Sequence, residues 1–184
     1  MNESEKMPET DQRTAENGKL KYAGLHYEEA VRLFADDITR LCVVWTQDEE
    51  AAKDCFQNIF LKLYQTEKIF HDTEHIKAWL IRVAKNECND YHRNSWHRNV
   101  ELGLVPENEE GTYQGEASDE ETERLVAALK KLPVKYREVL VLYYYQEYDT
   151  NEIADILRMS VNTVKARLRR GRKRLAEQMT AIRP

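Results

Sequence analysis

Residues 99–123 divide this chain of 184 residues into two parts of different character. The stretch holds nine Asp or Glu residues and no Lys or Arg, together with three Gly and one Pro. Charges of one sign repel one another and keep a segment extended, while Gly and Pro interrupt regular structure. The pattern therefore predicts a flexible acidic linker between two small domains, which a chain of this length can accommodate.

Helical periodicity of apolar residues dominates on both sides of this stretch. Before it, apolar residues recur at spacings of three and four over 25–47, over 48–63 and again from residue 76. Only 6 Gly and 4 Pro occur in the whole chain, too few for the turns of a many-stranded β protein. We therefore expect an all-α fold of two small helical domains. The expected divisions are a disordered tail (1–20), a first domain (21–98), the linker (99–120) and a second domain (121–184).

Several classes of protein are disfavoured by the composition. The longest apolar run, Val139–Tyr145, is seven residues and too short to span a bilayer. The N-terminal residues contain no apolar segment of the kind found in signal peptides. Cys42, Cys55 and Cys88 are far apart and odd in number, which favours buried free thiols over a disulfide framework. These features predict a cytoplasmic protein that is not inserted in a membrane.

One histidine pair needs separate consideration as a metal site. His71 and His75 are four residues apart, a spacing that can place two imidazoles on one helix face. The segment reads HDTEH, so the glutamate that serves as general base in a metalloprotease is missing from its position. A polar loop and helix start is the simpler interpretation, and a metal-dependent hydrolase stays as an alternative. We expect no metal, no cofactor and no enzymatic activity.

The C-terminal part carries the pattern of a helix-turn-helix. Asp149, with Glu152 three residues later, predicts a capping box at the start of one helix. A break at Met159 follows, and Ser160 is a suitable N-cap for a second helix. Seven Lys or Arg residues and no acid occupy 165–174 in that second helix. Two helices joined by a short turn, the second strongly basic, are typical of DNA-binding proteins.

A helical wheel separates the faces of this basic helix. One narrow face is apolar and suited to packing, and the opposite face holds Asn162, Thr163, Ala166, Arg169, Arg170 and Lys173, with Lys165 and Arg167 at the edges. Arg and Lys donate to guanine, Asn pairs with adenine, and Ala permits approach to a thymine methyl group. A merely solvated helix and a membrane-surface helix are the alternatives. The net charge of −5 does not exclude DNA, because residues 1–120 hold 25 acids and 14 bases (−11) whereas 121–184 hold 8 and 14 (+6).

Specific sequence segments now indicate a family. The segment LPVKYREVLVLYYYQEYDTNEIADILRMSVNTVKARLRRGRKRL resembles domain four of bacterial sigma factors, which binds the promoter −35 element. The segments DEEAAKDCFQNIFLKLY and AWLIRVAKNECNDYHR resemble the core-binding and promoter-melting helices of domain two. Both domains in this order, separated only by a linker, resemble the compact extracytoplasmic function (ECF) type.

The resemblance implies roles for individual residues. The residues implied to dock on the β′ subunit of the core polymerase are Asp54, Gln57, Asn58 and Phe60. Contacts with the melted −10 strand are implied for Asn86, Asp90 and Arg93 and for the loop 66–75. Within that loop, the ring of Phe70 is a candidate for stacking on an unpaired base. Reading of the −35 duplex falls to Lys165, Ala166, Arg169 and Arg170. The implied partners are the polymerase core with its β and β′ subunits, promoter DNA and an anti-sigma factor.

Two functional questions stay open at the level of sequence. A stand-alone helix-turn-helix regulator would share the C-terminal pattern but would not require the docking residues at 54–60. The acidic linker either threads a cationic channel of the polymerase or serves as a soluble spacer.

Overall fold

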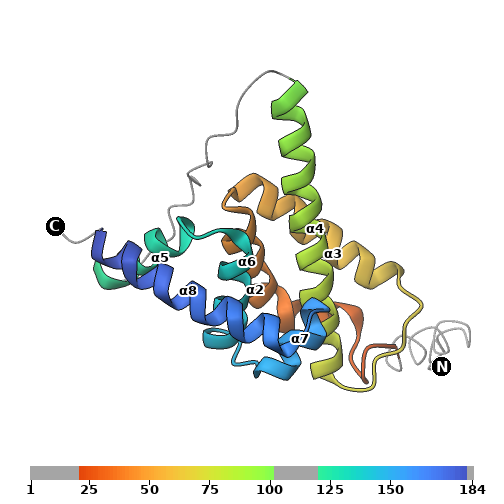
Figure 1. Cartoon of the computed structure of the whole chain (residues 1–184). Helices are drawn as coiled ribbons and strands as arrows, with labels where there is room; N and C mark the ends of the chain where they lie inside the picture. Colours follow the sequence, from red (N-terminus) through yellow and green to blue (C-terminus); the bar gives the residue numbers. More distant parts are fainter. Residues whose placement is uncertain (1–20, 102–119, 182–184) are drawn as a thin grey trace, which may run out of the picture.

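The computed structural model describes residues 21–101 and 120–181 and is entirely helical apart from isolated β-bridges within these ranges (Figure 1). The tail expected at 1–20 and the linker residues 102–119 lie outside the described residues. The helices are α2 (Tyr27–Thr46), α3 (Glu49–Gln65), α4 (Thr73–Glu101), α5 (Glu120–Lys130), α6 (Val134–Tyr144), α7 (Thr150–Leu157) and α8 (Val161–Ala181). The all-helical prediction is confirmed.

Helices α2, α3 and α4 pack together as one three-helix unit, which we call the N-terminal domain. The predicted cap of α3 is present, since Asp48 Oδ1 accepts a hydrogen bond of 2.9 Å from the backbone N–H of Ala51. The apolar stripes meet in a core that includes Ile38, Ile59 and Leu80, each fully buried. α4 is the longest helix in the described part of the chain, and its C-terminal end extends beyond the rest of the unit in Figure 1.

Helices α5 to α8 form the C-terminal domain, in which α8 packs across α5, α6 and α7. The predicted capping box opens α7: Asp149 Oδ1 accepts from the N–H of Glu152 at 2.9 Å, and Glu152 Oε2 accepts from the N–H of Asp149 at 2.7 Å. Ser160 caps α8, because its Oγ accepts from the N–H of Thr163 at 3.1 Å. Local side-chain chemistry therefore fixes the N-terminal ends of both helices of the helix-turn-helix.

A close contact between α6 and α8 depends on Gly171. A Cβ atom added at this buried glycine would lie 3.2 Å from Leu140 Cδ1 and 3.4 Å from Tyr136 Cβ. Glycine costs up to about 1 kcal/mol in a helix interior, and here it permits α8 to approach α6 closely. The orientation of the basic helix is thus set by side-chain packing beneath it.

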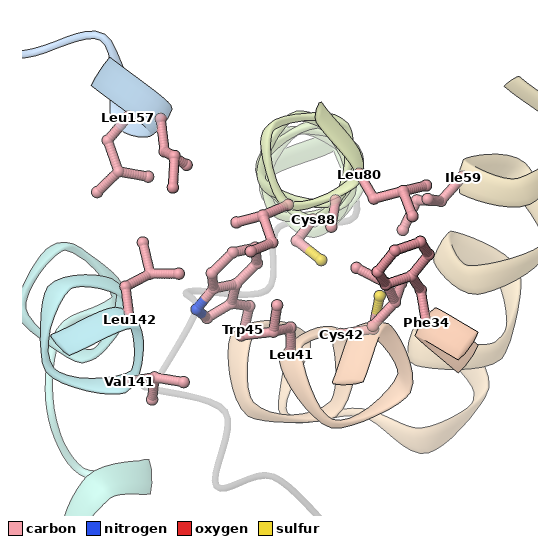
Figure 2. Packing of buried hydrophobic residues seen from close by; sticks show 14 of the residues in the cluster. Phe34, Leu41, Cys42, Trp45, Ile59, Leu80, Cys88, Val141, Leu142 and Leu157 are labelled. Atoms are coloured by element: carbon pink, nitrogen blue, oxygen red, sulfur yellow. The ribbon is translucent and has the colours of Figure 1, made fainter. Parts of the chain in front are cut away.

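The two domains are in direct contact. Figure 2 shows Trp45 of α2 directed toward Leu142 of α6, with Leu157 of α7 nearby. These three side chains are at most 4% exposed and belong to one continuous apolar cluster. The sequence predicts two domains joined by a linker and does not predict that they pack against each other. The structure shows this packing.

Candidate nucleic-acid interface

The packed face of α8 is apolar and buried. Val164 is fully buried, Leu168 is 3% exposed, and Gly171 lies against α6. Burial of this stripe leaves the opposite face in solvent, where the predicted residues Asn162, Lys165, Arg169, Arg170 and Lys173 are exposed. Thr163 and Ala166 are partly buried beside them. The structure therefore gathers the predicted DNA-reading residues on one exposed surface, which we call the α8 basic face.

The arginines of α8 differ in their partners. Arg167 Nη1 lies 4.0 Å from the buried Glu138 Oε2 of α6, so its guanidinium is directed partly toward the scaffold. Arg172 lies over the rings of Tyr143 and Tyr144, 5.5 and 5.6 Å from their centroids. No ion pair or ring contact of Arg169 or Arg170 occurs within the described residues. Their exposed guanidinium groups are therefore available to a ligand outside the domain.

A hollow of about 450 Å³ adjoins the α8 basic face. The residues that line it are Lys135, Tyr136, Asn162, Thr163, Ala166, Arg167 and Arg170. All the charged residues among them are cationic, which suits a phosphate group. Lys135 lies on α6 and extends the α8 basic face onto a second helix. A helical wheel of α8 alone cannot predict this contribution.

The buried carboxyl of Glu138, on α6 beneath the basic helix, makes the free energy of unfolding depend on pH. Burial raises the pKa of its carboxyl, and the charges of Lys85, Arg167 and Arg137 only partly oppose that shift. A raised pKa in the folded state means that the folded protein binds the proton more tightly than the unfolded chain. Stability from this group is therefore present below the unfolded pKa and declines as the pH rises through the folded pKa.

We expect Glu138→Gln to remove this dependence. The free energy of unfolding of the variant, relative to the unchanged protein, should increase as the pH rises from about 4 and should level off above the folded pKa. Urea unfolding at a series of pH values measures the difference. A difference that is the same at every pH would contradict the assignment.

The predicted docking residues lie on α3, with one exception. Asp54, Gln57 and Asn58 are exposed, whereas Phe60 is 4% exposed and packs against Phe56 with ring centroids 4.7 Å apart. Phe60 belongs to the apolar stripe of α3 and does not face solvent. Leu61 is 51% exposed and lies one helical turn after Gln57 and Asn58 on the same face of α3, an exposed apolar side chain that is not among the predicted docking residues.

The predicted −10 residues also divide into exposed and buried groups. Asn86, Asp90 and Arg93 are exposed on α4, and Asp90 pairs with Arg93 at 3.0 Å. Phe70 is only 1% exposed and packs edge-on against Trp79, with centroids 5.5 Å apart. Its backbone N–H donates to Lys21 O at 2.9 Å. Phe70 thus anchors the loop before α4 in the core and does not present a free ring in this arrangement.

The groups suggested for metal binding do not form a site. His71 and His75 stack with centroids 5.9 Å apart, and no group of three or more His, Cys, Asp or Glu in the described part of the chain could hold a metal ion. Cys42, Cys55 and Cys88 are free and buried, as predicted. No helix among the described residues is long and apolar enough to cross a membrane.

Both domains of the chain match known protein families. The family described as "Sigma-70 region 2" matches residues 30–98, and "Sigma-70, region 4" matches residues 122–175. The N-terminal domain therefore corresponds to region 2 of a sigma factor, and α8 lies in the part of the chain that corresponds to region 4. A stand-alone helix-turn-helix regulator would not account for the first match.

Individual relatives extend over most of the chain. ECF RNA polymerase sigma factor SigM of Bacillus subtilis (strain 168) is 30% identical over 80% of this chain and 91% of its own length. RNA polymerase sigma-E factor of Streptomyces coelicolor is 32% identical over 85% and 88%. The chain belongs to the ECF family of RNA polymerase sigma factors. It directs transcription initiation and is not an enzyme.

Solved structures show the same fold. The sigma factor RpoE of Bartonella quintana, in complex with the anti-sigma factor NepR, gives a TM-score of 0.73 at 20% identity, over 85% of this chain and 98% of that one. CnrH, in complex with the cytosolic domain of CnrY, gives 0.61 at 22% identity, over 85% and 89%.

Proposed function

We propose that the two domains divide promoter recognition and polymerase binding between them. The exposed face of α3 docks on the β′ subunit of core RNA polymerase through Asp54, Gln57 and Asn58. The exposed residues of α4, Asn86, Asp90 and Arg93, contact the melted −10 strand. Capture of unstacked bases offsets the cost of unstacking and so promotes strand opening.

The α8 basic face reads the −35 duplex in this proposal. The observation that carries it is the exposed row of Lys165, Arg169 and Arg170 on a helix whose opposite face is buried against α6 and α7. Arg and Lys at such positions donate to guanine in the major groove, and the adjoining cations contact phosphates. Phosphate contacts position the helix, and the base contacts give specificity.

The docking surface is tested by substitution on α3. Asp54→Ala combined with Gln57→Ala should weaken binding to core polymerase about 30-fold or more, because exposed residues at the centre of an interface each contribute up to about 2 kcal/mol. Fluorescence titration of labelled protein with core polymerase measures this. Glu49→Ala, an exposed substitution on another side of α3, is the matched control and should bind as the unchanged protein does. Equal affinities for all three proteins would exclude this face as the docking site.

Two further proposals concern the setting in which the protein works. We place it in the cytoplasm, where RNA polymerase acts. The similar sigma factor RpoE of Bartonella quintana was solved in complex with an anti-sigma factor, and we propose a protein of that class as a regulatory partner of this chain.

A further inference from the structure

A pocket of about 590 Å³ lies among four helices, away from the α8 basic face and from the predicted docking residues of α3. Val44 of α2, Leu129 of α5, Leu140 of α6 and Leu175 of α8 each contribute an aliphatic side chain to its walls. Figure 1 shows these four helices grouped beside one another. None of the described residues that line this apolar pocket belongs to the proposed docking, −10 or −35 residues, so the proposed function leaves the pocket unexplained.

Tight contacts hold the walls of the apolar pocket in place. Gln47 Nε2, at the C-cap of α2, donates to the backbone oxygen of Lys130 at the end of α5. At Gly171, α8 approaches α6 so closely that an added Cβ atom would lie 3.2 Å from Cδ1 of Leu140, itself a wall residue. The pocket is therefore formed by packing before any ligand binds, as is usual for small-molecule sites.

The edge of the apolar pocket is aromatic and cationic. Tyr144 and Tyr145 line it and are 60% and 45% exposed. The guanidinium of Arg40 donates to the hydroxyl of Tyr145 and lies 5.8 Å from the centroid of that ring. Arg172 lies 5.6 Å from the ring centroid of Tyr144. Among the described lining residues Arg40 is the only charged one, so the pocket combines an apolar interior with a positive edge.

The size of the apolar pocket favours a small molecule over a protein surface. Small-molecule sites are typically cavities of about 300–1,000 Å³, mostly apolar, with a few polar groups that orient the ligand. A protein–protein contact of standard size involves about 20–30 residues on each side. Only nine residues line this pocket in the described part of the chain. A hydrocarbon chain in the interior, with one anionic group at the edge, matches both parts of the lining.

We propose that the apolar pocket binds a small amphiphilic carboxylate, with its hydrocarbon chain between the four helices and its carboxylate on the guanidinium of Arg40. Burial of the chain removes apolar surface from water, which favours binding. A planar guanidinium can donate two N–H groups to the two oxygens of one carboxylate. Asp37, on the same helix, pairs with Lys77 at 3.1 Å and does not line the pocket. The proposal is independent of the assigned contacts with polymerase and DNA.

A series of chain lengths tests the apolar part of the site. Isothermal titration calorimetry of the full chain with sodium hexanoate, octanoate and decanoate, each below its micelle concentration, should show one site. The affinity should increase about 4-fold for each added CH₂ group, until the chain fills the pocket. Absence of binding, or several sites with the same affinity for every chain length, would overturn the proposal and leave the pocket as a contact for a protein partner.

Substitution of Arg40 tests the position of the carboxylate. Arg40→Gln should weaken the binding of octanoate about 3- to 5-fold, because a pair exposed at the edge of a pocket contributes modestly. The same variant should bind octan-1-ol, which has no charge, as the unchanged protein does. Arg32→Gln, at another exposed arginine of α2, is the control and should change neither affinity. Equal losses for octanoate and octan-1-ol in Arg40→Gln would contradict the assigned ion pair.

Filling the apolar pocket provides the last test. Leu125 lines the pocket from α5 and is 39% exposed, so Leu125→Trp adds volume there without replacing a fully buried side chain. This variant should bind octanoate about 10-fold or more weakly, because an overpacked site costs free energy. Leu33→Trp, at an exposed leucine of α2, is the matched control and should bind octanoate as the unchanged protein does. Circular dichroism checks that both variants fold. Equal octanoate affinities for the two folded variants would place the ligand elsewhere and refute the site.

Discussion

Replacement of Arg169 and Arg170 by alanine should reduce binding to a −35 duplex about 100-fold or more. Each well-placed contact of an arginine with a base contributes about 1–3 kcal/mol, and these two side chains are exposed on the α8 basic face. Fluorescence anisotropy at fixed salt, with matched and scrambled duplexes, measures the effect. The loss should be larger on the matched duplex, because base contacts carry the sequence information.

The control for this prediction is Lys131→Ala, which removes an exposed cation between α5 and α6. This substitution should change the affinity for either duplex very little, because Lys131 lies away from the α8 basic face. If the double variant lost the same affinity on matched and scrambled DNA, the two arginines would be phosphate contacts, and the proposed reading of bases would be wrong.

Trp45→Ala should cause the largest loss of stability among single substitutions considered for this chain. Removal of a buried tryptophan side chain costs about 3–5 kcal/mol, from lost apolar burial and from the cavity that stays behind. Trp45 is 1% exposed and packs between α2 and the C-terminal domain, so both domains lose contacts. Urea unfolding followed by circular dichroism measures the free energy of unfolding.

Leu33→Ala on the same helix is the matched comparison. Leu33 is 54% exposed, so its substitution should change the free energy of unfolding by about 0.5 kcal/mol or less. A loss below about 1 kcal/mol for Trp45→Ala would mean that the indole is not held between the domains as the structure shows.

The features that follow from neighbouring residues could be predicted from the sequence. The caps at Asp48, Asp149 and Ser160 depend on side chains within three residues of the groups they bind, and all three are present. The division of α8 into packed and exposed faces follows from helical geometry alone. For the same reason the buried stripe of Val164 and Leu168 agrees with the helical wheel.

The structure buries Phe60 and Phe70, and only one of these burials follows from local pattern. Phe60 already lies on the apolar stripe of α3, one residue after Ile59, and the structure buries it. Phe70 follows a loop whose path is set by a backbone contact with Lys21, nearly fifty residues away in the chain. Periodicity cannot predict a contact of that range.

The contact between the domains was also beyond the sequence analysis. Trp45 occupies an apolar position of α2, and periodicity shows that such a residue is buried but not which element covers it. Arg82 and Lys85 donate to backbone carbonyls at the end of α7. Every residue has such a carbonyl, so no residue type in the sequence marks these partners, and the two cations would be interpreted as solvated. The exposure of Leu61, in contrast, follows from helical spacing, because Leu61 lies two residues from both Ile59 and Leu63 and thus off the apolar stripe of α3.

Transcription reconstituted from this chain and core RNA polymerase tests the central claim most directly. Mapping of the 5′ ends of the transcripts should reveal discrete start sites that core polymerase alone does not use, preceded by shared −10 and −35 sequences. Arg169→Ala/Arg170→Ala should remove these starts, and Asp54→Ala/Gln57→Ala should remove them by preventing assembly. Transcripts identical to those of core polymerase alone, on DNA that carries candidate promoters, would contradict the account.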